Sequence, residues 1–271
     1  MDRENVHENA RDVTRVSFAK LNTAKKKFKK LIFIPAVFAA VIIFIVICFV
    51  FFFKVKTVSV EGASKYSEDL LIIKSGIIAG ENLYSYSEKD IEEKLMLNYP
   101  YISNVKLKRR WPDKITIQVS EDTAAYVTEI YGETLILSES LRILENPDIN
   151  ADSVELCKLI LPDIDRALVG NAPVFTIDSG YILTALKAIR ESELADRKTK
   201  IDLRNKFSIS FLMGNMYKVK CGDINDLDLK LTMTEKILES GQISDGTKAE
   251  LDISNPAECT ALLGDNANIS L

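Results

Sequence analysis

The chain has 271 residues, of which 47% are hydrophobic and 27% charged, and its formal net charge at pH 7 is −4. This composition excludes a disordered or collagen-like chain, and the length allows two modest domains with cores of their own. The three cysteines after residue 150 form no C-x-x-C motif and allow at most one internal disulfide, so no disulfide-dependent scaffold is expected: Cys157, Cys221 and Cys259.

A membrane anchor is predicted near the N-terminus. The segment 31–53 is an uncharged run of 23 residues, and about 20 apolar residues suffice for a helix to cross the hydrocarbon core. The alternative is a cleaved signal peptide, whose apolar region would be shorter and followed by small residues at the cleavage site. Here VFFFKVKT follows. We therefore expect an uncleaved span.

The arm before this span, residues 1–30, contains nine basic and four acidic residues and ends in KKKFKK. Basic residues in a short segment beside a span favour the cytoplasmic side. We therefore expect the arm in the cytoplasm, where it can also touch anionic lipid, and everything after about Lys54 on the other side. Because the arm carries a net charge of +5, the rest of the chain carries −9.

The first module after the span alternates apolar and polar residues in a strand, helix, helix, strand, strand order. The pattern predicts a strand ending at Gly62, two helices and a hairpin: 55–60, 67–76, 87–99 and 104–121. Ser67 and Ser87 are typical N-cap residues for the two helices. The module is thus a β-α-α-β-β unit.

The second part of the chain is richer in short strands. Tyr131-Gly132 is predicted as the turn of a hairpin, and the irregular, acidic segment 147–180 has no order of elements that we can assign. The remaining predictions are a helix, three strands, a helix, a final strand and a polar tail: 182–191, 200–203, 206–212, 217–222, 225–240, 249–254 and 256–271. Together the two parts predict an α+β protein with a single N-terminal transmembrane helix.

The tip of the first hairpin carries Arg109, Arg110 and Trp111, the chain's only tryptophan. Bases beside an aromatic residue can mark nucleic-acid contact, but the predicted topology places the tip outside the cytoplasm, where nucleic acid is not expected. The residues suit an acidic partner surface or lipid headgroups. The alternative is a solvated turn whose tryptophan covers the sheet edge.

No catalytic or metal-binding constellation is predicted in the exported part. The only histidine is His7, on the predicted cytoplasmic arm, and the adjacent pair Ser64-Lys65 does not have the S-x-x-K spacing of Ser-Lys enzymes. DINDLD at 223–228 has aspartate where a calcium loop needs glycine, so it is interpreted as an acidic helix start. We expect no cofactor and no enzyme activity. The rival hypothesis is a membrane-anchored envelope enzyme acting on cell wall polymers.

The final predicted strand, at Ala249–Ile253, precedes the polar tail, so its outer edge is a candidate for pairing with a strand of another protein. The alternative is an ordinary core strand. These two interpretations stay open on the residues alone.

Several segments are similar to those of a known family. They are VKTVSVEG after the span, the stretch 80–121 with its KRRWPDKITIQVSE hairpin, and YKVKCGDINDLDLKLTMTEKILES followed by AELDIS. In this order they resemble the FtsQ/DivIB family of bitopic bacterial division proteins. The resemblance implies the following division: cytoplasmic arm 1–30, transmembrane helix 31–53, POTRA domain 54–122, β domain 123–255 and polar tail 256–271.

The resemblance also implies a function. Such a protein is a non-catalytic scaffold at the division septum that binds FtsL-type and DivIC/FtsB-type bitopic partners and helps regulate septal wall synthesis, with the septal wall synthase as a further partner. Partner binding at the membrane-distal end of the second domain points to Leu251, Ile253, Ser254 and Asn255. The hairpin tip at Arg109, Arg110 and Trp111 is the second predicted contact.

Overall fold

The structure is a computed structural model. It describes residues 33, 35–147, 154–194, 198–244 and 246–271. The predicted cytoplasmic arm, with its basic residues and His7, lies outside the described residues. Contacts divide the chain into two compact units, of which the first includes the apolar helix, Ile77–Tyr86 and Lys108–Thr116 and the second includes Val60–Gly76, Ser87–Leu107 and Ile117–Leu271.

The apolar helix extends over Pro35–Phe52 and is long and apolar enough to cross a membrane. Its 18 residues correspond to about 27 Å at 1.5 Å per residue, close to the thickness of a hydrocarbon core. Large side chains along it, such as Phe38, Phe44 and Phe51, are exposed. A helix that is apolar on all sides requires apolar surroundings. A single N-terminal helix of this kind was predicted.

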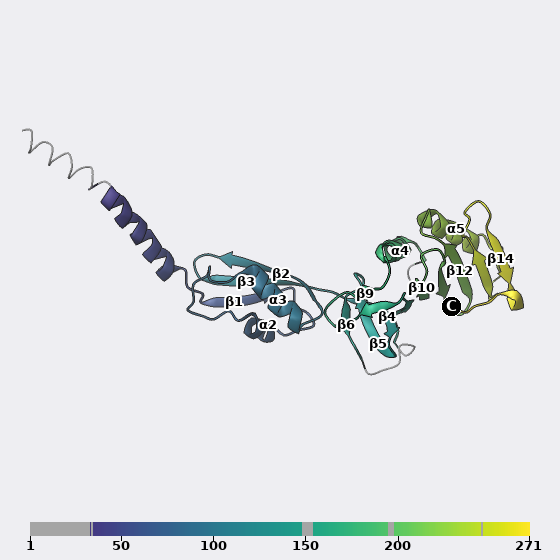
Figure 1. Cartoon of the computed structure of the whole chain (residues 1–271), viewed down its shortest axis with the longest axis horizontal. Helices are drawn as coiled ribbons and strands as arrows, with labels where there is room; N and C mark the ends of the chain where they lie inside the picture. The colour runs from purple at the N-terminus through teal and green to yellow at the C-terminus, as the bar shows by residue number, and fades with distance from the viewer. Residues whose placement is uncertain (1–32, 34, 148–153, 195–197, 245) are drawn as a thin grey trace, which may run out of the picture. The chain divides into compact units, whose positions relative to one another are not determined.

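The next elements follow the predicted β-α-α-β-β order and appear in Figure 1. They are β1 (Thr57–Glu61), α2 (Glu68–Ser75), α3 (Glu88–Asn98), β2 (Ile102–Arg110) and β3 (Lys114–Glu121), and the strands form a sheet in the order β1-β3-β2. β3 is the central strand, and its apolar residues at alternate positions turn one face of the strand toward the core. Ile115, Ile117 and Val119 are all buried.

Two glycines and two serines define the ends of these elements. Gly76 ends α2 in the left-handed conformation, as its position predicted. At Gly62 a Cβ would lie 2.2 Å from the carbonyl oxygen of Val119, so only glycine fits. Ser67 and Ser87 occupy the predicted N-cap positions, although neither side chain caps its helix by a hydrogen bond.

The second part of the chain forms a nine-stranded sheet in the order β14-β13-β12-β11-β10-β7-β4-β5-β6. Its strands are β4 (Ala124–Ile130), β5 (Glu133–Ser138), β6 (Ile143–Glu145), β7 (Cys157–Ile160), β10 (Lys198–Asp202), β11 (Ile209–Met213), β12 (Tyr217–Gly222), β13 (Ala249–Asp252) and β14 (Thr260–Leu263). The hairpin turn at Tyr131-Gly132 was predicted correctly, and both residues have positive φ, as a tight hairpin turn requires.

The segment that the sequence left unassigned contributes a central strand. β7 lies between β4 and β10 and is parallel to both. The same segment contains β8 (Ile164–Arg166) and β9 (Val174–Phe175), which pair with each other in a separate two-stranded sheet. A four-residue strand whose partners are 30 to 40 residues away gives no local signal, which is why periodicity missed it.

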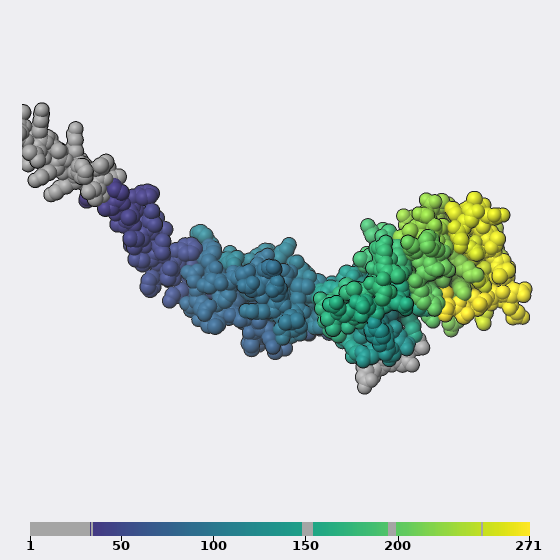
Figure 2. All heavy atoms as spheres, in the orientation of Figure 1, coloured from purple at the N-terminus to yellow at the C-terminus, as the bar shows by residue number. Residues whose placement is uncertain are grey.

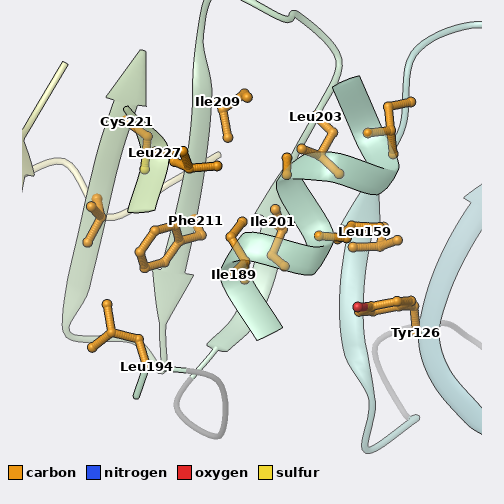
Figure 3. Close-up of a cluster of buried hydrophobic side chains, with 14 of the residues drawn as sticks. Tyr126, Leu159, Ile189, Leu194, Ile201, Leu203, Ile209, Phe211, Cys221 and Leu227 are labelled. Carbon is orange, nitrogen blue, oxygen red and sulfur yellow. The ribbon is translucent and has the colours of Figure 1, made fainter. Parts of the chain in front are cut away.

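The core of this domain lies under two helices, α4 (Gly180–Glu191) and α5 (Leu227–Glu239). Figure 3 shows side chains from α4, including Ile189, directed toward side chains of the neighbouring strands, among them Ile201 and Leu159. Phe211 on β11 is completely buried in the same cluster. The apolar residues of α4 recur at helical spacing, so that one face of the helix covers the sheet.

Within the second unit, Arg142 joins four separate stretches of chain. Its guanidinium donates to the carbonyl oxygens of Pro100, Ile102 and Gly170 and to the carboxylate of Asp122, at 2.8 to 3.3 Å. The planar fork of an arginine can satisfy several acceptors at once. This side chain therefore ties the end of the β2–β3 hairpin to the β5–β6 connection.

The position of Phe211 leads to a stability prediction. Replacing Phe211 by alanine removes a fully buried aromatic ring from the core, so we expect the free energy of unfolding to fall by about 3–5 kcal/mol. Phe207→Ala, four residues earlier at an exposed position, is the matched control and should change it by less than about 0.5 kcal/mol. Urea unfolding of the full chain in detergent micelles, followed by circular dichroism, measures both. Equal losses for the two variants would contradict the described core.

Candidate protein-interaction site

The last three strands form one end of the nine-stranded sheet. β12 and β13 are parallel and are connected by the crossover helix α5, and β13 then pairs antiparallel with β14. A parallel pair needs such a crossover, whereas the short connection after β13 suits an antiparallel return. β14 is therefore the terminal strand at this end. Figure 2 shows the C-terminal residues, in yellow, as exposed surface.

The predicted free edge at Ala249–Ile253 was wrong. β14 pairs with β13 along its whole length, from Ala249 opposite Leu263 to Asp252 opposite Thr260. The side chains of Leu251 and Ile253 are 1% and 0% exposed. The segment interpreted as a polar tail supplies the covering strand. The contribution of Leu251 and Ile253 to partner contact remains a prediction, and on this geometry they support the sheet from its core.

The sequence contained a weak signal for β14. The run Ala261, Leu262 and Leu263 is apolar and is followed by Gly264, which has a φ of +64°. Four residues in a segment interpreted as a polar tail were too few for the alternation test. The register with β13 could only be found in the structure.

Ser254 and Asn255, the other two residues predicted here, are exposed and begin the connection between β13 and β14. The backbone N–H of Ser254 donates to the carboxylate of Asp252 at 3.0 Å, and the side-chain oxygen of Asn255 accepts from Ala257 at 3.1 Å. These are Asx turns that hold the connection in one conformation. At Gly222 a Cβ would lie 2.9 Å from that of Ser254, so the connection also packs closely on β12.

The backbone of β14 directs hydrogen-bonding groups away from the sheet. Gly264 donates to the carbonyl oxygen of Lys248 at 2.8 Å. In an antiparallel pair, every second residue directs its backbone N–H and C=O groups toward the partner strand. Leu262 and Thr260 therefore also face β13, while the N–H and C=O groups of Ala261 and Leu263 point to the open side. The side chains of Leu262 and Leu263 are 52% and 43% exposed.

The remaining C-terminal residues pack on the sheet beside this edge. Glu250 on β13 accepts hydrogen bonds from the Lys220 ammonium and from the backbone N–H of Asn268, the latter at 3.0 Å. Lys218 donates to the carbonyl oxygen of Ser270. The Lys220 hydrogen bond, followed by the Asn268 N–H, lowers the pKa of Glu250 below its ordinary value of 4.5. The end of the chain is thus held against β12 and β13.

The three predicted tip residues belong to the first unit and differ in role. Arg109 donates to the carbonyl oxygens of Leu83 and Tyr86 at 3.2 and 2.6 Å, so its guanidinium holds a neighbouring loop. Arg110 is exposed. Trp111 is 70% exposed, and its ring centroid lies 5.1 Å from that of Phe53. The structure does not relate these residues to the four predicted near β13.

The cysteines show no disulfide. All four lie in the described part of the chain, and Cys221 is buried in the core. Among the described residues, no group of three or more His, Cys, Asp or Glu side chains is placed to hold a metal ion.

Comparison with known proteins gives matches over most of the chain. The family described as "POTRA domain, FtsQ-type" matches residues 53–122. The cell division protein DivIB of Clostridium botulinum is 24% identical over 239 residues, which are 88% of this chain and 92% of that protein. The cell division protein FtsQ of Corynebacterium glutamicum is 22% identical over 201 residues, 73% of this chain and 85% of the relative.

These matches support the FtsQ/DivIB family assignment predicted from the sequence. The predicted resemblance is confirmed, and it supports a role in cell division. The N-terminal apolar helix and the family together fit a membrane-anchored division protein. The residues matched by the POTRA family, 53–122, contain the elements from β1 to β3.

The clamp at Glu250 leads to a prediction on pH. Because its pKa is lowered in the folded state, Glu250 stabilises the fold above its unfolded pKa of about 4.3, and this stabilisation is lost as the pH falls through the folded pKa. Glu250→Gln should therefore lower the unfolding midpoint at pH 7 and have progressively less effect as the solution is acidified. Thermal unfolding of the full chain measures this, with Glu258→Gln, an exposed carboxylate nearby, as control. A difference that stays constant with pH would contradict the clamp.

Proposed function

We propose that this protein is a non-catalytic membrane-anchored scaffold of the bacterial divisome, which binds its partners by accepting an added strand at the open edge of β14. The observation that supports this most directly is the exposed terminal strand, with the backbone groups of Ala261 and Leu263 directed away from the sheet. The names of the relatives support the setting, since they are cell division proteins.

Strand addition uses properties that β14 has. An extended segment of a partner gains backbone hydrogen bonds along an unpaired edge, and alternate side chains provide selectivity. On β14 the exposed Leu262 and Leu263 lie on opposite faces of the sheet, so an added strand meets an apolar side chain on each side. A partner segment with apolar residues on both faces is the best match.

The identity of the partners comes from the family resemblance. We infer that they are the FtsL-type and DivIC/FtsB-type bitopic proteins, with the septal wall synthase as a further partner. The same inference places the N-terminus in the cytoplasm, the POTRA and nine-stranded domains outside, and the protein at the septum, where it helps regulate wall synthesis. The basic arm supports this orientation.

The test is a pull-down from solubilised membranes with the full chain as bait. Ala261→Pro removes one backbone N–H that faces away from the sheet. The hydrogen bonds between β14 and β13 are kept, because proline is tolerated where the N–H of an edge strand faces solvent. We expect recovery of the coiled-coil bitopic partners to fall by about tenfold or more, corresponding to the loss of a hydrogen bond and a distorted edge. Ala261→Thr keeps the N–H and suits a strand, so it should bind as the unaltered chain does.

Circular dichroism and the unfolding midpoint must stay unchanged in both variants, because a lost fold would also abolish binding. If Ala261→Pro retains full recovery of the partners while folding normally, strand addition at β14 is wrong. Recovery of wall polymer in place of bitopic proteins, by the unaltered chain, would instead favour the envelope enzyme.

A further inference from the structure

The first unit carries a second exposed surface that strand addition does not use. It surrounds the end of the apolar helix and consists of an aromatic cluster, Phe49, Phe53, Tyr84 and Trp111, flanked by basic residues. We call this surface the juxtamembrane collar. Its aromatic members come from three segments of chain that the fold brings together.

The collar is fixed directly to the helix, with no linker in between. Phe53, the residue after the helix, accepts a hydrogen bond from the N–H of Leu83 at 2.7 Å, and Val55 donates to the carbonyl oxygen of Glu81 at 2.8 Å. The side chain of Asn82 reaches back to the carbonyl oxygen of Phe49 at 3.2 Å, inside the last turn of the helix. The loop 77–86 therefore cannot move away from the helix end without losing these bonds.

The rings extend this attachment outward. The Tyr84 ring centroid lies 4.9 Å from that of Phe49, and the Trp111 centroid lies 5.1 Å from that of Phe53. Yet Trp111 remains 70% exposed. Ile78, on the loop 77–86 that also carries Tyr84, is exposed as well. If the helix crosses a bilayer, an exposed indole this close to its end is expected at the depth where the hydrocarbon meets the headgroups.

The charges around the collar contrast with those of the exported part as a whole. The first unit from Phe53 onward has two acidic residues, Glu81 and Asp113, and six basic ones: Lys54, Lys56, Lys108, Arg109, Arg110 and Lys114. The chain after the span carries −9 in total. Positive charge is thus concentrated next to the helix end. Asp113 is itself paired with Lys56 at 2.9 Å, so the other charged residues around the collar are mostly basic.

We propose that the juxtamembrane collar binds the bilayer surface, with Trp111 and Tyr84 in the headgroup layer and Arg110 and Lys114 on the phosphates of anionic phospholipids. Amphipathic rings favour this layer because it is apolar on one side and wet on the other. Basic side chains within a Debye length of an anionic surface are attracted to it. The span supplies the occupant, since a helix that crosses the bilayer brings its own end to the lipid.

Trp111 is the chain's only tryptophan, so its fluorescence reports on the collar alone. The experiment places the full chain in nanodiscs of phosphatidylcholine with or without phosphatidylglycerol and measures quenching by aqueous acrylamide, which is uncharged, and by lipids brominated near the headgroup. We expect strong quenching by the brominated lipid, and about twofold or greater protection from acrylamide in the anionic discs relative to the neutral ones.

A set of variants tests whether the protection of Trp111 depends on the basic side chains of the collar or only on its closeness to the bilayer. Arg110→Gln with Lys114→Gln should remove most of the extra protection in anionic discs, whereas Lys187→Gln with Lys206→Gln, an equal change of charge in the second unit, should not. Arg109 is left in place because it holds the loop. Full access of acrylamide to Trp111 in both discs would overturn the proposal. So would protection that requires an added partner protein, or protection indifferent to lipid charge and to the Arg110 and Lys114 changes.

Discussion

The order of strands in the nine-stranded sheet is the constraint on which the candidate interaction site depends. α5 returns the chain to the same end of the sheet, so that β13 must lie parallel to β12, and the following antiparallel strand can only be added outside β13. The buried side chains of Leu251 and Val219 hold these strands in register against α5. β14 is exposed for this reason, and its own composition has little part in it.

The sequence predicted those elements whose stabilising contacts are local in the chain. The β-α-α-β-β module, the Tyr131-Gly132 turn and the helices around Leu186 and Leu231 all follow from short-range periodicity or turn chemistry. β7 and β14 were missed because each has four residues, and pairing with distant strands determines their place. The same limit caused the error at Leu251 and Ile253, where the strand was predicted and its outer neighbour was not.

The hairpin tip shows a different limit of sequence interpretation. Arg109 and Arg110 are adjacent and chemically identical, and both were predicted as contact residues of the tip. In the structure the guanidinium of Arg109 donates hydrogen bonds to the carbonyl groups of Leu83 and Tyr86, while the side chain of Arg110 is exposed. Alternation along β2 turns the two side chains to opposite faces, and on one of these faces the loop 77–86 accepts the hydrogen bonds of Arg109.

The open edge of β14 is short, and this bears on how such a scaffold can work. Ala261 and Leu263 together offer two donors and two acceptors, and at about 1 kcal/mol net for each hydrogen bond an added strand gains roughly 4 kcal/mol, equivalent to a dissociation constant near 1 mM. An edge this weak resists unwanted pairing with other proteins. A partner anchored in the same membrane is a different case, because anchoring raises its effective concentration and confines its approach. If β14 accepts a partner strand as proposed, the apolar helix at Pro35–Phe52 therefore serves selectivity as well as attachment, because a four-residue edge then binds partners in the same membrane and leaves free ones unbound.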